Sequence, residues 1–538
     1  MTLIEATFTD SLADQIAARR TFAIISHPDA GKTTLTEKLL LYGNAIHLAG
    51  SVRARRNQRH SRSDWMAIER ERGISVTSTV LQFPYRSRVI NLLDTPGHED
   101  FSEDTYRTLA ATDSAVMVLD AAKGIEAQTR KLFEVCRRRG IPIFTFINKM
   151  DRPARDLLEL LDEIETVLGM QPVPMNWPIG DGPGFKGVCD RHSEPRRRKV
   201  HLFDRTAHNQ TVAPETVIPL DSPELRQALS DSEIDKLKAD LSLMDGLGFE
   251  FDPELLLAGA QTPVYFGSAL TNFGVQFFLD AFVDHAPPPR SYLSDIGLID
   301  PARLDFSGFI FKIQANMNPN HRDSVVFLRV CSGRFQRDMS VVHTRSGKSL
   351  RLPRPYKFFA NERELLEEAY PGDIIGLPSN GEFAIGDTLC AGERFAIAPM
   401  PRFQPEHFAL LRNTDVSKQK QFQKGMLQLE TEGAMQVLYD VDAHQRNPIL
   451  AVVGQLQFDV VRARLESEYS VVTILEPLGY RFSRWVDGPP EVIDQLPWGH
   501  GLQKVRDTHG QLVALFHSQF DLDYCLQKFP EVAFRSLG

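Results

Sequence analysis

The sequence predicts a doubly wound α/β domain with a mostly parallel sheet, followed by a β-barrel domain and then by an α+β domain. In the first 285 or so residues, nearly continuous apolar runs alternate with stretches of helical pattern, as in parallel sheets covered on both faces. Between residues 306 and 398, short apolar runs alternate with Gly, Asn and Pro turns, which is typical of a small barrel. Helix and strand patterns alternate in the remainder.

Composition places the chain among ordinary globular proteins. Its 538 residues include 61 Lys and Arg against 70 Asp and Glu, a formal net charge of −9. The hydrophobic share of 42% and the charged share of 24% exclude collagen-like, disordered and disulfide-scaffold classes. The acidic balance argues against a protein that coats nucleic acid, and we expect no DNA partner.

The sequence also predicts a cytoplasmic location. No run of about 18 apolar residues is present, so we expect no membrane-spanning helix. The first residues lack a basic segment followed by an apolar core, so no secretory signal is visible. The five cysteines lie far apart without a Cys-x-x-Cys pair, which fits a reducing compartment.

The domain boundaries follow from these patterns. Residues 1–285 form the α/β domain, with strands expected at 22–26, 89–94, 115–119, 142–148 and 263–268 and helices at 33–42 and 128–139. A stretch at about 171–261 breaks the rhythm and is interpreted as an insertion. The prolines of Ala286-Pro287-Pro288-Pro289-Arg290 open a linker over 286–305. The barrel covers 306–398, and the α+β domain covers 399–538, with helices expected at 418–437 and 456–468 and strands at 449–453 and 471–475.

A phosphate-binding loop is predicted where the first strand runs into a helix. Such a loop needs backbone N–H groups around phosphate, a lysine at the β- and γ-phosphates and a hydroxyl for Mg²⁺. Lys32 and Thr33 fill the last two roles, Gly31 permits close backbone approach, and Ser26 replaces the usual first glycine. The whole segment is Ser26-His27-Pro28-Asp29-Ala30-Gly31-Lys32-Thr33-Thr34.

Three further motifs follow later strands. The first is Asp94-Thr95-Pro96-Gly97-His98, where Asp94 can orient Mg²⁺ through water and the Gly97 N–H can meet the γ-phosphate. In Asn148-Lys149-Met150-Asp151, the Asp151 carboxylate can accept from the paired N–H donors of guanine, which adenine lacks. After the last strand, backbone N–H groups of Ser268 and Ala269 can reach guanine O6. Four such motifs in one α/β domain indicate a P-loop GTPase domain.

This set resembles the translational GTPases, in which the residue after Asp-Thr-Pro-Gly positions the attacking water. The resemblance therefore implies a catalytic role for His98. Arg72-Gly73-Ile74-Ser75-Val76-Thr77 is similar to the switch I segment of that family, which usually reads Arg-Gly-Ile-Thr. Ser75 is the expected switch ligand of Mg²⁺ beside Thr33 and Asp94, and Thr77 is the alternative.

Within that superfamily the whole chain is similar to the class II release factors, the family of bacterial peptide chain release factor three. The Ser-His-Pro-Asp variant at Ser26–Asp29 carries this resemblance, together with Gly184-Phe185-Lys186-Gly187-Val188-Cys189-Asp190. Segments of the barrel and of the last domain, such as Gly386-Asp387-Thr388-Leu389 and Gln428-Leu429-Glu430-Thr431, also match. The resemblance implies a ribosome-dependent GTPase that promotes dissociation and recycling of class I release factors. It further implies GTP or GDP and Mg²⁺ as ligands, ribosomal RNA and proteins as partners, and a monomer off the ribosome.

Three other functions fit the sequence less well. A translocase of the elongation factor G group needs further domains after the third, and this chain ends about 130 residues beyond Pro401. A peptide-releasing hydrolase needs a Gly-Gly-Gln loop, which the sequence lacks. A nucleotide-binding scaffold without turnover is disfavoured by the intact set of Lys32, Thr33, Asp94 and His98.

Five arginines lie in an acid-free stretch before switch I. Either they form a solvated loop, or they form an arm that meets phosphates of ribosomal RNA. The residues are Arg53, Arg55, Arg56, Arg59 and Arg62.

Overall fold

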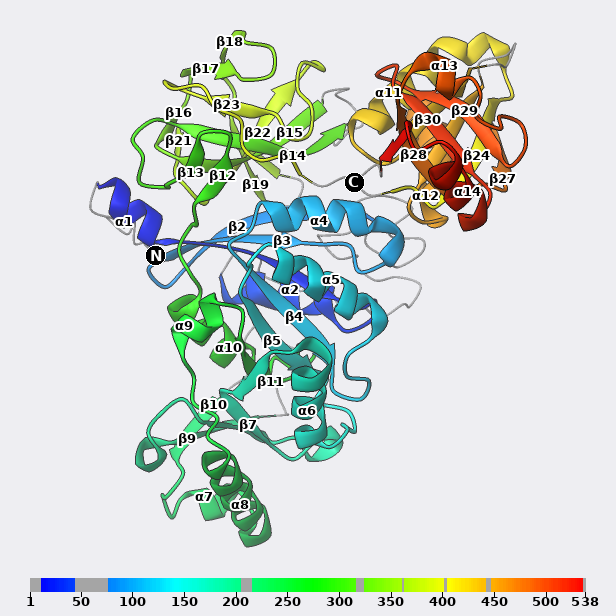
Figure 1. Ribbon diagram of the computed structural model, residues 1–538. Coiled ribbons are helices and arrows are strands. Elements are labelled where there is room, and N and C mark those ends of the chain that lie inside the picture. Colours follow the sequence, from blue (N-terminus) through cyan, green and yellow to red (C-terminus); the bar gives the residue numbers. More distant parts are fainter. Residues whose placement is uncertain are drawn as a thin grey trace.

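The computed structural model describes residues 11–43, 76–204, 215–315, 324–359, 362–400, 404–441 and 447–535. The α/β domain occupies the centre of the molecule, the insertion extends from one end, and the barrel and C-terminal domains lie side by side at the other (Figure 1). The predicted switch I residue Ser75 and the arginine stretch at 53–62 lie outside the described residues. In the part of the chain that the structure describes, no helix is long and apolar enough to cross a bilayer.

The central sheet of the α/β domain confirms the predicted parallel core. Its strand order is β2-β3-β1-β4-β5-β11-β6, and every neighbouring pair is parallel except β2 with β3. The apolar runs did not reveal β2 or β6. The strands are β1 (Arg19–Ser26), β2 (Thr79–Tyr85), β3 (Arg88–Asp94), β4 (Ser114–Asp120), β5 (Ile143–Asn148), β6 (Gln171–Pro174) and β11 (Gln261–Phe266).

Helices cover both faces of this sheet, which explains the uninterrupted apolar strands. Along β1, Phe22 and Ile24 pack in one core cluster while Ala23 and Ile25 pack in the other. Alternate side chains of a strand point to opposite faces, so a strand buried on both sides is apolar throughout. Helices α2 (Lys32–Tyr42) and α10 (Val275–His285) supply the first cluster, while α4 (Ser102–Ala110), α5 (Ala127–Arg138) and α6 (Leu157–Leu168) supply the second. The short α1 (Leu12–Ala17) precedes β1.

The insertion forms an antiparallel sheet with helices packed beside it. The sheet has four strands in the order β10-β9-β8-β7. Because β6 pairs with β11 in the central sheet, the inserted unit begins later than residue 171. The elements are β7 (Asn176–Ile179), β8 (Gly187–Asp190), β9 (Lys199–Phe203), β10 (Glu215–Pro219), α7 (Leu225–Ala228) and α8 (Asp231–Gly246). The short helix α9 (Pro253–Leu257) follows them and packs against β11 of the central sheet.

The barrel domain joins the central sheet through β19 and β2, where Phe359 is paired with Leu81. A hairpin of β12 (Tyr292–Ser294) and β13 (Gly297–Ile299) lies in the predicted linker. The longest barrel pair is β14 (Ser307–Ala315) with β15 (Ser324–Ser332). The other strands are β16 (Phe335–Gln336), β17 (Ser340–His343), β18 (Ser349–Arg351), β19 (Tyr356–Phe359), β20 (Glu362–Leu365), β21 (Glu368–Ala369), β22 (Ile374–Ser379) and β23 (Thr388–Cys390).

The C-terminal domain is an eight-stranded sheet with two long helices, α11 (Gln419–Thr431) and α12 (Leu456–Tyr469). The helix predicted over 418–437 is too long, because Gly433 adopts a left-handed φ of 73° and the chain enters β25 at Gln436. The other elements are β24 (His407–Asn413), β25 (Gln436–Asp440), β26 (Pro448–Val452), β27 (Thr473–Leu478), β28 (Phe482–Asp487), β29 (Leu502–Asp507), β30 (Leu512–Phe516), β31 (Ala533–Arg535), α13 (Pro490–Ile493) and α14 (Gln519–Lys528).

Candidate nucleotide site

The four predicted motifs follow β1, β3, β5 and β11, which are parallel strands of one sheet. Parallel strands have their carboxyl ends at the same edge, so the four loops meet there. Contacts between the loops show that the four motifs form a single site at this edge of the sheet.

The first loop is shaped to expose backbone N–H groups at the start of α2. Asp29 and Gly31 have positive φ values of 65° and 97°, so the chain curls before the helix begins. No side chain caps the first turn of α2 through its N-cap, Gly31. The N-terminus of an 11-residue helix, with free N–H groups and a positive dipole end, suits an anion such as phosphate.

Lys32 and Asp94 lie together at the centre of this edge. The Lys32 ammonium forms an ion pair with Oδ1 of Asp94, and both side chains are buried. Within the described residues, the other carboxylate oxygen of Asp94 is buried and accepts no hydrogen bond. The Thr95 hydroxyl donates to the Ile24 carbonyl, 2.6 Å away, and so ties the second loop to β1.

The second loop turns back against the first. A Cβ placed at Gly97 would lie 3.5 Å from Cα of Pro28, so the two backbones are in close contact. His98 follows as the N-cap of the short helix η1 (Glu99–Phe101), with about a third of its side chain exposed. Its Nδ1 accepts the backbone N–H of Asp100 at 3.3 Å.

Asn148 joins three of the loops. Its Nδ2 donates to the Ala30 carbonyl at 2.8 Å, and its Oδ1 accepts the Ala269 N–H at 2.9 Å. A Cβ on Gly31 would lie 2.2 Å from Nδ2 of Asn148, so a side chain at residue 31 would break this contact. The sequence predicts Asn148 at this site, and in the structure its side chain holds the three loops together.

Asp151 and Ser268 face each other from the third and fourth loops. The Ser268 hydroxyl donates to Oδ1 of Asp151 at 2.6 Å, which leaves the second carboxylate oxygen of Asp151 for other donors. Met150 is fully buried in the core, and its N–H donates to the Gly267 carbonyl. Met150 thus anchors the loop through packing and backbone contact.

Sequence reasoning missed Asp120, the last residue of β4. Its Oδ2 accepts from the Lys149 ammonium at 2.7 Å. Burial alone would raise the pKa of Asp120, but hydrogen bonds from Lys149 and from the Ala122 N–H outweigh it and hold the pKa below its usual value. The ionised carboxylate therefore fixes the stem of Lys149. An acidic residue at the end of an apolar strand was the available signal.

The remaining predicted residues lie in the same loops and in the first turn of α2. His27 places Nε2 3.3 Å from a carboxylate oxygen of Glu126, and the Ser26 hydroxyl is buried without a partner among the described residues. Pro96 accepts a hydrogen bond from Thr105 through its carbonyl. Thr33 and Thr34 are half-buried in the first turn of α2.

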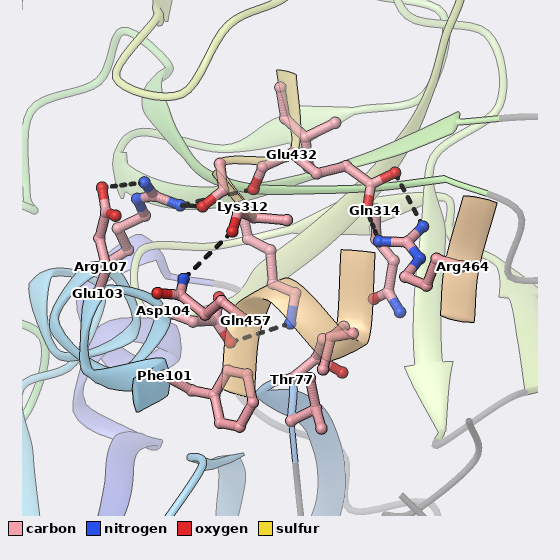
Figure 2. Close-up of a pocket in the computed structure, with 15 residues that line it drawn as sticks. Thr77, Phe101, Glu103, Asp104, Arg107, Lys312, Gln314, Glu432, Gln457 and Arg464 are labelled. Atoms are coloured by element: carbon pink, nitrogen blue, oxygen red, sulfur yellow. Dashed lines mark hydrogen bonds and ion pairs between the residues drawn. The ribbon is translucent and has the colours of Figure 1, made fainter. Parts of the chain in front are cut away.

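Thr77, the alternative switch ligand, lines a different place. It borders a cavity of about 60 Å³ between the α/β domain, the barrel and the C-terminal domain (Figure 2). Charged side chains from all three domains line it. Lys312 of the barrel lies 3.5 Å from Asp104 of the α/β domain, and Arg464 lies 2.6 Å from Glu432 within the C-terminal domain. Arg107 of α4 donates to the Gly433 carbonyl.

Comparison with protein-family models gives three matches along the chain. Residues 17–288 match the elongation factor Tu GTP-binding domain, and residues 305–392 match elongation factor G domain 2. Residues 397–526 match the model described as class II release factor RF3, C-terminal domain.

Curated relatives match over nearly their whole length. Peptide chain release factor 3 of Gloeobacter violaceus is 58% identical over 529 residues, covering 98% of this chain and 99% of that protein. The protein of the same name from Nostoc punctiforme is 56% identical, covering 98% and 96%. A crystal structure of a Thermus thermophilus protein shares the fold, with a TM-score of 0.68 and 22% identity over 91% of this chain and 72% of that one.

Proposed function

This chain belongs to the peptide chain release factor 3 family of translational GTPases that act in termination, and we propose that it uses GTP to drive class I release factors off the ribosome. The observation that carries the proposal is the joining of the four loops. Asn148 braces the phosphate loop against the base loops, and Lys32 pairs with Asp94 of the second loop. The C-terminal match to the release factor model favours this function over that of a translocase.

In this proposal, guanine is recognised by Asp151, Lys149 and the loop after β11. One carboxylate oxygen of Asp151 is held by Ser268, and the carboxylate as a whole can accept from N1–H and N2–H₂ of guanine. Lys149, fixed by Asp120, provides an aliphatic stem for one face of the base. The rigid loop selects guanine because adenine offers no paired donors at that edge.

Phosphate binding falls to Lys32 and to the free N–H groups at the start of α2. The buried, unshared oxygen of Asp94 fits a cation held through water, and Thr33, the residue after Lys32 in the first turn of α2, provides a hydroxyl for the same cation. Mg²⁺ usually keeps several waters and takes few protein ligands besides the phosphates, and when bound it neutralises phosphate charge. The position of Thr77 at the cavity between the domains supports Ser75 as the switch ligand.

His98 is the residue we assign to the attacking water. It follows Gly97, whose N–H is the expected donor to the γ-phosphate, and its imidazole is partly exposed on the loop that contacts Pro28. A positioned imidazole orients water without holding the ground-state phosphates, so its effect is on the rate and not on affinity.

The proposed task is recycling, carried out in the cytoplasm on the ribosome. The GTP form must bind one ribosome conformation better than the other, because a ligand shifts an equilibrium only by its differential affinity. If that conformation holds the class I factor weakly, the factor leaves, and hydrolysis then releases this protein. The chain has no Gly-Gly-Gln tripeptide, which agrees with a protein that does not itself free the peptide.

The test is multiple-turnover peptide release with ribosomes in excess over a class I release factor, with and without this protein and GTP. We expect a higher turnover rate and an unchanged first-turnover burst. A Lys32→Ala variant serves as the matched control and should give no acceleration. Peptide release by this protein alone, or an effect confined to the burst, would refute the proposal.

A further inference from the structure

Helix α12 of the C-terminal domain is capped by a residue of the α/β domain. Its first residue, Leu456, donates its backbone N–H to Oδ2 of Asp100 at 2.6 Å. The helix's own N-cap, Gln455, makes no side-chain cap bond. A carboxylate at this position satisfies a free N–H and interacts favourably with the helix dipole. The contact therefore contributes to docking of the two domains.

The surfaces around Asp100 are shaped for close approach. A Cβ on Gly454 would lie 2.2 Å from Cγ of Asp100 and 2.4 Å from its Cα, so only glycine leaves room. Beside this contact, Phe101 and Val76 of the α/β domain pack with Val460 of α12 in an apolar cluster. This cluster and the Asp100 cap together hold α12 against η1.

The same Asp100 holds His98. The Asp100 N–H donates to Nδ1 of His98, and Oδ1 of Asp100 lies 3.4 Å from that nitrogen. A neutral imidazole whose Nδ1 accepts a hydrogen bond carries its proton on Nε2. While the Asp100 N–H occupies Nδ1, Nε2 therefore has no free lone pair and cannot accept a proton or a hydrogen bond from water.

We propose that Asp100 is a positioning residue through which the C-terminal domain restrains hydrolysis. While α12 is docked, Asp100 is fixed by the Leu456 N–H and keeps Nδ1 of His98 engaged. Withdrawal of α12 frees Asp100, and the His98 ring can then turn and accept from the attacking water. A ribosome that binds the undocked arrangement better would thereby switch the site on. This inference rests on the proposed role of His98.

The test measures GTP hydrolysis by the full-length protein without ribosomes. Asp100→Ala removes the cap, and Gly454→Ala separates the two surfaces while leaving Asp100 in place. Loss of one helix cap is expected to raise kcat about fivefold, equivalent to about 1 kcal/mol. KM for GTP should stay within about twofold of the wild type, because neither residue meets the ground-state phosphates. The double variant should be no faster than either single variant, since both break one contact.

Two control variants separate this contact from general effects of substitution. Asp415→Ala removes a carboxylate that caps the short helix η4 (Val416–Lys418) within the C-terminal domain. Gly246→Ala adds a methyl group that meets nothing within 4 Å. Both should hydrolyse GTP at the wild-type rate. Wild-type or lower rates in Asp100→Ala and Gly454→Ala, or multiplying gains in the double variant, would overturn the proposal.

A third comparison distinguishes failure of this inference from failure of the proposed site. The gain from Gly454→Ala should vanish in a His98→Ala background, and a persisting gain would show that the contact does not act through His98. If His98→Ala alone leaves ribosome-stimulated hydrolysis unchanged, the assignment of His98 to the water is wrong. If instead His98→Ala is inactive and Gly454→Ala is unchanged, the site stands and the restraint does not exist.

Discussion

Asn148 donates a hydrogen bond of 2.8 Å to the carbonyl of Ala30 and thereby links the loop after β5 to the phosphate loop after β1. The two residues are far apart in sequence, yet both lie at the carboxyl ends of parallel strands. The contact means that the part of the site expected to read the base and the part expected to hold phosphate are one rigid unit. It also explains why residue 31 is glycine.

Base selectivity should depend on Asp151. In Asp151→Asn, an amide donor replaces one acceptor and suits the 2-carbonyl of xanthine in place of the amino group of guanine. We expect the variant to lose GTP affinity by about 10²-fold or more, on the order of the effect of unpaired buried polar groups, and to gain XTP binding. Equilibrium titration with labelled nucleotides measures both.

The control for this change is Asp156→Asn. Asp156 caps α6 by accepting from the N–H groups of Leu158 and Glu159, and Asn is an equally good cap. Its GTP affinity should match the wild type. Unchanged GTP affinity in Asp151→Asn would mean that another loop recognises the base.

Substitution of Lys32 should impair nucleotide binding, whereas substitution of His98 should impair catalysis. Lys32→Ala removes a buried cation beside Asp94 and should weaken GTP binding itself. His98→Ala should leave affinity nearly unchanged and lower ribosome-stimulated kcat by about 10²-fold or more, the usual cost of losing a positioned group. Nucleotide titration and single-turnover hydrolysis on ribosomes measure the two effects, and identical defects in both variants would contradict the assignment.

The joint between the α/β domain and the barrel should be a major source of stability. Arg329 and Asp113 form a fully buried ion pair of 2.6 Å, and Arg329 also donates to the Gly372 carbonyl. Burial would lower the pKa of Arg329, but Asp113 outweighs it, so the guanidinium is charged. Arg329→Met leaves a buried carboxylate unpaired and should cost about 3–5 kcal/mol.

Urea denaturation of the full-length protein measures this cost. The double variant Arg329→Met with Asp113→Leu removes both charges and should recover most of the loss. Arg337→Met, at a surface pair with Glu367, should leave the midpoint unchanged. A single Arg329→Met variant as stable as the wild type would show that the pair does not hold the domains together.

The barrel should lose stability in acid through Asp387. Burial would raise the pKa of Asp387, but hydrogen bonds from Arg345 and the Ala384 N–H, with the nearby His343, hold it below its usual value. A carboxyl whose pKa is lower in the folded state stabilises the fold above its unfolded pKa, and this contribution is lost as the pH falls through the folded pKa.

The measurement is the melting temperature of the full-length protein between about pH 6 and about pH 3, a range whose lower end is below the ordinary pKa of aspartate. Asp387→Asn should be less stable than the wild type near neutral pH, and the difference should shrink as the pH falls. A constant difference over this range would exclude Asp387 as a source of acid sensitivity.

The sequence alone was sufficient for most of the central sheet. Strands β1, β3, β4, β5 and β11 are buried on both faces, so each appears as an apolar run, and all of them except β4 are followed by a loop with a recognisable motif. Strand β2 is partly exposed and carries Pro84, and β6 is only four residues long, so neither shows a clear pattern. The helix predicted over 418–437 failed because helix propensity continues past Gly433 while the backbone does not.

What the sequence determined by itself is local: the apolar strands, the Gly31 turn, and the types of residue at each loop that suit phosphate, cation and guanine. What only the tertiary structure decided is which loops touch. Asn148 meeting Ala30, Lys149 meeting Asp120 and Asp100 capping α12 each join residues from different strands or domains. No local pattern encodes these contacts, because they depend on strand order and on how whole domains pack. For the same reason, Thr77 matches a switch residue in sequence but lies at the cavity between three domains.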